Sequence, residues 1–205
     1  MKALLIVDVQ NDFLPGGALA VPEGDQIIPV INRLQERFSC IVATKDWHPR
    51  NHVGFASFHG KAPGDVIKVH GRKQELWPDH CIQNTPGAEF SPELHTNPII
   101  KVFFKGTNPE IDSYSPFYDN DHKQSTGLGD YFRSLGVEEI YIAGLATDYC
   151  IKYGVFDAVT LGFKVYVVID ACRGIDLKPG DVERSIQEMK EAGADIISSA
   201  SLLKF

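Results

Sequence analysis

The chain has 205 residues, of which 43% are hydrophobic and 23% are charged, and its formal net charge is −7. A chain of this length and composition can bury one well-formed core, so we expect a single domain over residues 1–205. The negative charge and the scattered lysines and arginines exclude a nucleic-acid backbone as the expected partner.

The first apolar run, residues 3–7, has the length of a buried strand and ends at Asp8. It is too short for the apolar region of a signal peptide or for a membrane span. The four cysteines form no CxxC pair, which is typical of a reducing compartment in which thiols stay free. We therefore expect a cytoplasmic protein with no membrane partner.

A Gly/Pro-rich loop follows, and Asp25 is expected to cap the next helix. The apolar face of that helix is expected to consist of Ile27, Ile28, Ile31 and Leu34. A strand at 40–44 then runs directly into the segment KDWHPRNH. Residues 53–98 lack a clear period, so we expect a long irregular excursion over the sheet, of the kind that is usually functional or disordered.

The second half of the chain alternates strands and helices more regularly. Thr126 is expected to cap a helix that Gly136 ends. The other elements are expected as strands at 98–104, 139–144, 164–170 and 195–199, a helix that begins after Thr147 and a helix at 180–192. This alternation implies right-handed crossovers and a parallel sheet covered on both faces. The fold class is therefore α/β.

Cys150 is expected in the first turn of the helix that follows strand 139–144. Unpaired backbone N–H groups and the positive end of the helix dipole favour a thiolate there, which can lower the pKa of a cysteine by several units. Most free cysteines are simply small buried side chains, and this stretch alone does not decide between the two roles.

Polar residues also end the preceding strands: Asp8, then Asp46 with His48, then Lys105. Ligands bind beyond the carboxyl ends of parallel strands, so we expect these groups and Cys150 to converge on one edge of the sheet. A carboxylate near Cys150 can accept its proton, and an ammonium keeps that carboxylate ionised. Taken singly, each residue also fits an ordinary loop position. Together they predict a Cys–Asp–Lys site, and a Cys–His dyad ranks lower because His48 is placed one strand further away.

Asp46 and His48 are two residues apart, so an extended backbone lets both point to the same side. A metal site needs at least one more ligand. The local candidates are His52, His59, His70 and His80. A mixed Asp/His set with open positions suits zinc, iron or manganese, although the DxH spacing alone does not establish a site.

Five segments resemble, in order, the nicotinamidases, also called pyrazinamidases, of the isochorismatase-like cysteine hydrolases. They are IVDVQNDF, TKDWHPRNH, WPDHCIQNTPGAEF, FFKGTNPEIDSYSPF and GLATDYCIKYGVFDAV, and the match covers nearly the whole chain. The resemblance implies a three-layer αβα sandwich on a six-stranded parallel sheet. It also implies hydrolysis of nicotinamide to nicotinate and ammonia, and of pyrazinamide to pyrazinoate, through a cysteine thioester in NAD salvage.

The resemblance also implies the catalytic roles. Cys150 matches the nucleophile, Asp8 the general base and Lys105 the third member of the triad. The backbone N–H groups of Ala146 and Cys150 would form the oxyanion hole. A cis peptide bond would fall just before the nucleophile helix, between Leu145 and Ala146.

Asp46, His48 and His80 match the ligands of one divalent metal ion, with zinc expected first and iron or manganese as alternatives. His52 stays open as a further ligand, because the length of that loop varies among relatives. In the mechanism that the resemblance implies, the metal holds the pyridine nitrogen of the substrate.

Phe13, Trp77 and Tyr114 match the aromatic lining that sandwiches the pyridine ring, although Phe13 also fits an ordinary core position. The expected partner is thus a small molecule, nicotinamide. The sequence leaves the oligomeric state open, a homo-oligomer included.

Three rival functions remain. One is another cysteine hydrolase of the same fold, an N-carbamoyl amide hydrolase or an isochorismatase, which the metal-ligand set disfavours because those relatives lack it. The second is a non-catalytic binding protein on this fold, which the complete triad disfavours. The third is a hydrolase that uses metal-bound water, in which Cys150 is incidental.

Overall fold

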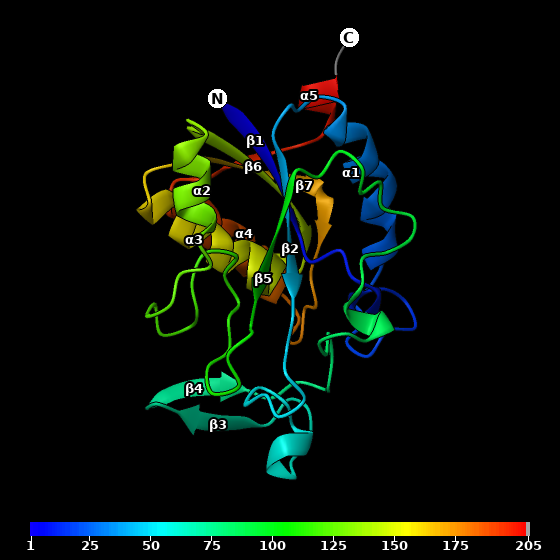
Figure 1. Ribbon diagram of the computed structural model, residues 1–205, viewed down its shortest axis with the longest axis vertical. Helices are drawn as coiled ribbons and strands as arrows, with labels where there is room; N and C mark the ends of the chain where they lie inside the picture. The colour runs from blue at the N-terminus through cyan, green and yellow to red at the C-terminus, as the bar shows by residue number, and fades with distance from the viewer. Residues whose placement is uncertain (204–205) are drawn as a thin grey trace.

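The computed structural model describes residues 1–203, in which six strands form one sheet in the order β5-β2-β1-β6-β7-β8 (Figure 1). Every neighbouring pair in this sheet is parallel. The strands are β1 (Lys2–Val7), β2 (Ile41–Asp46), β5 (Lys101–Lys105), β6 (Glu139–Leu145), β7 (Lys164–Arg173) and β8 (Asp195–Ile197). The six-stranded parallel sheet predicted from the sequence is confirmed.

Helices cover both faces of the sheet (Figure 1). One face carries α1 (Ile27–Gln35) and α5 (Ala200–Leu203), and the other carries α2 (Leu128–Ser134), α3 (Lys152–Thr160) and α4 (Asp181–Glu191). Successive side chains of a strand point to opposite faces, so Leu4 of β1 packs in the cluster on the α1 side and Leu5 in the other. This arrangement is the expected αβα sandwich. Within residues 1–203, no helix is long and apolar enough to cross a membrane.

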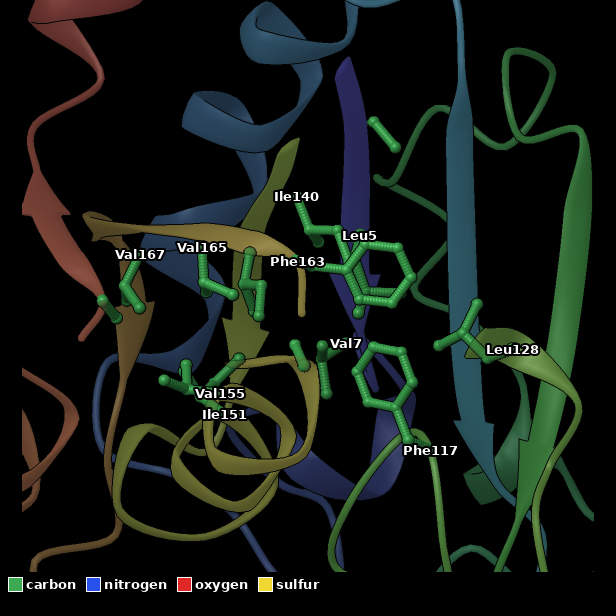
Figure 2. Packing of buried hydrophobic residues seen from close by; sticks show 14 of the residues in the cluster. Leu5, Val7, Phe117, Leu128, Ile140, Ile151, Val155, Phe163, Val165 and Val167 are labelled. Carbon is green, nitrogen blue, oxygen red and sulfur yellow. The ribbon is translucent and has the colours of Figure 1, made fainter. Parts of the chain in front are cut away.

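The core between the sheet and α3 fixes the segment that carries Cys150. Figure 2 shows Val155 and Ile151 packed against the apolar side chains of the sheet, with Val7 of β1 beside Phe117. Ile151 is fully buried, and it directly follows Cys150. The π-helical segment Thr147–Ile151, which carries Cys150 and leads into α3, is therefore held against the sheet by the apolar side chains that follow the thiol.

The sequence predicted a wholly irregular segment between β2 and β5. The structure shows that part of this segment is regular. It contains an antiparallel hairpin formed by β3 (Val66–Val69) and β4 (Arg72–Glu75). The hairpin turn is His70–Gly71, with φ of 51° and 82°, as a two-residue turn of the primed type requires. The hairpin escaped prediction because its strands are largely exposed and carry little apolar alternation, and because histidine rather than asparagine or aspartate precedes the glycine.

Two capping predictions need correction. Asp25 lies inside a short 3₁₀ turn, Gly24–Gln26, and makes no cap, because α1 begins only at Ile27. The four apolar residues expected on the buried face of α1 are all buried. The N-cap of α2 is Gly127, yet the Thr126 hydroxyl still accepts the N–H of Leu128 at 3.2 Å.

Candidate active site

Four neighbouring strands deliver polar side chains to the carboxyl edge of the sheet. Lys105 ends β5, Asp46 ends β2, Asp8 follows β1, and Cys150 follows β6. These strands are contiguous in the sheet, and all four side chains are buried. The convergence expected from the strand ends is therefore present.

The Lys105 ammonium stands at the centre of this group. Its Nζ lies 3.0 Å from Oδ2 of Asp8 and 3.4 Å from Sγ of Cys150, and it also donates to Oδ1 of Asp46. A further bond of 3.1 Å runs to the carbonyl of Ser113. One oxygen of each aspartate and the Cys150 sulfur lie within 4.8 Å of one another. A thiol, a carboxylate and an ammonium are thus in mutual reach.

Burial determines how these groups ionise. It raises the pKa of the Cys150 thiol well above its ordinary value, although Lys105 opposes the shift. It likewise raises the pKa of Asp8, against the opposing effects of Lys105 and of the Thr44 hydroxyl, which donates to Oδ1 at 2.7 Å. Burial alone would lower the pKa of Lys105, but Asp46 and Asp8 outweigh it and keep the ammonium charged. The lowered thiol pKa expected from the helix terminus is wrong, so this thiol needs a base.

Asp46, His48 and His80 form a second group of ligand atoms within 4.8 Å of one another. The Nε2 atoms of His48 and His80 lie 3.3 Å and 3.7 Å from Oδ2 of Asp46. The Nδ1 atom of each ring is hydrogen-bonded to a backbone carbonyl. His48 pairs with the carbonyl of Gly106 at 2.9 Å, and His80 pairs with that of Pro78 at 2.7 Å. Such bonds orient a ring so that Nε2 faces a cation. The three residues therefore fit one divalent metal ion with open coordination positions.

Two features shape this ligand group. Burial would raise the pKa of Asp46, but Lys105 and His48 outweigh it and hold the carboxyl well below its usual range. The Gln10 side chain makes two hydrogen bonds of 2.8 Å to the backbone of Asp46. Its Nε2 donates to the Asp46 carbonyl, and its Oε1 accepts the Asp46 N–H. Gln10 was not singled out from the sequence, where its one signal is its position two residues after Asp8.

The predicted aromatic residues Phe13, Trp77 and Tyr114 line one pocket at this edge. The same pocket is lined by Ala146 and Cys150, and the three metal-type ligands border it. The peptide bond between Leu145 and Ala146 is cis, as expected. Four lining residues were not predicted, namely Leu19, Asp112, Tyr149 and Ile175.

Residues 2–201 match the isochorismatase domain family. The chain is also 49% identical over 203 residues to a nicotinamidase of Escherichia coli, with 97% of this chain and 95% of the relative covered. The chain belongs to the nicotinamidases of the isochorismatase family.

Two solved structures of this family are similar in fold. A yeast nicotinamidase bound to the inhibitor nicotinaldehyde has a TM-score of 0.92 and 32% identity, over 97% of this chain and 100% of its own. A pyrazinamidase of Pyrococcus horikoshii in complex with zinc has a TM-score of 0.79 and 42% identity, over 96% of this chain and 98% of its own.

Among the residues of this nicotinamidase-family site, His52 lies beside both His48 and Asp112, and one ligand atom of each of these three residues lies within 4.8 Å of the others, so His52 stays a candidate further ligand. Its Nε2 lies 3.9 Å from Oδ1 of Asp112, and its Nδ1 accepts the Gly54 N–H at 3.2 Å. Burial and the neighbouring His48 lower the pKa of His52 to about 4, so the ring is neutral. Within residues 1–203, His52 Nε2 is one of the few buried side-chain polar atoms without a hydrogen-bond partner.

The raised thiol pKa makes a prediction for chemical labelling. Iodoacetamide reacts with the thiolate, so we expect the alkylation rate of Cys150 to be slow at neutral pH and to keep rising above about pH 9. Peptide mapping by mass spectrometry separates Cys150 from the other three cysteines, all of which are unpaired. A rate that reaches its plateau below about pH 8 would show a lowered pKa and contradict this description.

Proposed function

We propose that this protein hydrolyses nicotinamide to nicotinate and ammonia, and pyrazinamide to pyrazinoate, through a thioester on Cys150, as a step of NAD salvage. One observation supports this above the others: the Lys105 ammonium contacts Asp8, Asp46 and Cys150 at the base of an aromatic pocket. The identity of the related nicotinamidases over the full chain supports the choice of substrate.

The substrate ring lies between aromatic side chains in this proposal. Phe13, Trp77 and Tyr114 supply apolar area to its two faces, and that contact favours a flat, uncharged ring. Binding then places the carboxamide carbon beside the Cys150 sulfur. The reaction starts from positioning, because a fixed attack geometry removes much of the entropic barrier.

Asp46, His48 and His80 would hold one divalent cation, and zinc is our first choice. The Asp/His donor set suits zinc, and the Pyrococcus relative is a zinc complex; iron and manganese are the alternatives. When bound, the cation supplies a Lewis acid that can ligate a pyridine nitrogen and so orient the ring. Everything else in the reaction falls to side chains and backbone groups of the chain.

Asp8 takes the proton of the Cys150 thiol, and the sulfur attacks the carboxamide carbon. The backbone N–H groups of Ala146 and Cys150 stabilise the oxyanion, a contribution worth roughly 3–4 kcal/mol per donor in other enzymes. The carbon–nitrogen bond then breaks, and Asp8 returns its proton to the departing ammonia. Water, deprotonated by Asp8, hydrolyses the thioester, releases nicotinate and restores the thiol. Lys105 holds Asp8 in place and offsets negative charge throughout.

The setting of this activity is part of the proposal. We place the enzyme in the cytoplasm as a single domain, because all four cysteines are unpaired and the family match spans residues 2–201. The partner is the small-molecule substrate. A homo-oligomer is compatible with the proposal but is not required, because the catalytic and ligand side chains all come from one chain.

The proposal is tested by ammonia release from nicotinamide by the purified protein in zinc-containing buffer. We expect turnover of nicotinamide, and much weaker turnover of benzamide, which has the same shape but lacks the ring nitrogen. Absence of ammonia release from nicotinamide in metal-replete buffer would refute the proposed hydrolysis of nicotinamide. Equal rates on the two amides would remove the role of the ring nitrogen.

Metal removal provides a separate prediction. Chelation is expected to abolish turnover and added zinc to restore it, because the cation orients the substrate. His80→Ala removes one ligand and is expected to lower metal affinity at least about 100-fold, with activity following metal content. His95→Ala, at an exposed histidine that does not line the pocket, serves as the control. Full activity at zero metal content by atomic absorption would refute the role of the cation.

A further inference from the structure

The hairpin of β3 and β4 ends in two residues that reach the walls of the substrate pocket. Glu75 accepts the hydroxyl of Tyr149 at Oε2, at 2.7 Å. The buried Gln74 donates through Nε2 to the Tyr114 hydroxyl at 3.3 Å and to Oδ2 of Asp112 at 3.0 Å. Tyr149, Tyr114 and Asp112 all line the pocket that contains Cys150. Neither Gln74 nor Glu75 lines that pocket, so both act on it through other side chains.

The aromatic rings form one connected frame. The Tyr149 ring stands edge-on to Trp77, with centroids 4.9 Å apart and planes at 87°, and 5.5 Å from the Tyr114 ring. Trp77 closes the frame by donating its Nε1–H to the Tyr114 hydroxyl at 3.2 Å. Edge-to-face contacts hold rings at fixed angles, so tilting one ring displaces the others.

The hydroxyl group of each tyrosine in this frame is hydrogen-bonded to a residue of the hairpin. Burial and the Glu75 carboxylate raise the pKa of Tyr149, so its hydroxyl keeps the proton that it donates. Without Glu75 the hydroxyl loses a charged acceptor in a half-buried place, and the ring angle then depends on the edge contacts with Trp77 and Tyr114. Tyr149 directly precedes Cys150, so its ring is the part of the pocket wall nearest in sequence to the nucleophile.

We propose that Gln74 and Glu75 are positioning residues, which hold Tyr114 and Tyr149 at the angles that grip the substrate ring and so determine substrate affinity more than the rate of the chemical step. This inference rests on the proposed amide hydrolysis at the same site. It assigns a task to the hairpin beyond that of covering the edge of the sheet.

The test compares the steady-state constants for nicotinamide of Glu75→Ala, Tyr149→Phe and the double variant. Each single change removes the same hydrogen bond, so we expect KM to rise about tenfold with kcat within about twofold of the original. The double variant is expected to match the singles, because residues of one bond do not act additively. Glu75→Gln keeps an acceptor oxygen and is expected to restore most of the affinity. Lys68→Ala, at an exposed residue of the same hairpin, is the matched control and should leave both constants unchanged.

The inference is overturned by an unchanged KM in Glu75→Ala, by a double variant whose effect is the product of the singles, or by a loss confined to kcat. A Glu75→Ala protein that fails to fold leaves Tyr149→Phe as the test, since it removes the same bond from the other side and keeps the ring. A wild-type protein without turnover refutes the proposed function itself. The affinity for nicotinaldehyde, measured by calorimetry on the same variants, then decides the inference, and absence of binding to the wild type overturns it as well.

Discussion

Replacing Cys150 by alanine is expected to lower kcat/KM for nicotinamide by at least about 10⁴-fold, which is the scale of loss when a nucleophile is removed from a cooperating set. The sulfur lies 3.4 Å from the Lys105 ammonium and within 4.8 Å of an Asp8 oxygen, and a thiol in that position can form a thioester. The measurement is ammonia release by wild type and variant at equal zinc content. Retained turnover by the variant with metal bound would end the thioester mechanism and favour attack by metal-bound water.

The matched control is Cys40→Ala. Its thiol is also buried, but Cys40 precedes β2 and so lies at the opposite, amino end of the sheet. We expect this variant to keep its kcat/KM within about threefold and to lose at most about 1–2 kcal/mol of stability from the small cavity. A comparable activity loss in both variants would mean that packing, and not nucleophilic attack, explains the effect at Cys150.

Asp8→Asn is expected to lower kcat by about 10²–10⁴-fold, the usual contribution of a general base. Asparagine has the same shape and keeps an oxygen for the Thr44 hydroxyl, so the fold should survive. It cannot take the thiol proton, and the raised thiol pKa makes a base necessary at neutral pH. The kcat of the variant is compared with that of Asp25→Asn, at an exposed aspartate that the structure places away from this pocket. More than about a tenth of the original kcat in Asp8→Asn would refute its role as the base.

Much of the fold and half of the site follow from elementary rules. The apolar run of β1 ends at Asp8, β5 ends at Lys105, and parallel strands carry such residues to a common edge. That rule required no knowledge of side-chain contacts, and it placed Asp46 and Cys150 with the other two. The resemblance added the residues that spacing could not choose.

The choice of His80 among four local histidines shows where spacing fails. The structure places the Nε2 atom of His80 3.7 Å from Oδ2 of Asp46. His59 instead holds the carbonyl of Val53 at 2.8 Å, and His70 is exposed beside Asp121. These partners depend on how the long segment between β2 and β5 folds back, which no local pattern encodes.

The sign of the Cys150 pKa shift failed for a related reason. A helix terminus is visible in the sequence, whereas burial of the Cys150 thiol beside Asp8, Asp46 and Lys105 is a property of the assembled site. The same holds for Tyr149 and Glu75, whose bond joins residues 74 positions apart. Contacts of this kind become predictable only once the tertiary arrangement is known.

The most direct test of the central claim, that Cys150 attacks a carbonyl carbon held in this pocket, uses nicotinaldehyde labelled with carbon-13 at the aldehyde. Attack by the sulfur turns that carbon tetrahedral, so we predict a new thiohemiacetal signal in the carbon NMR spectrum of the zinc-loaded wild type and its absence in Cys150→Ala. A bound aldehyde whose carbon stays trigonal or merely hydrated in the wild type, or the same tetrahedral signal in both proteins, would contradict the account.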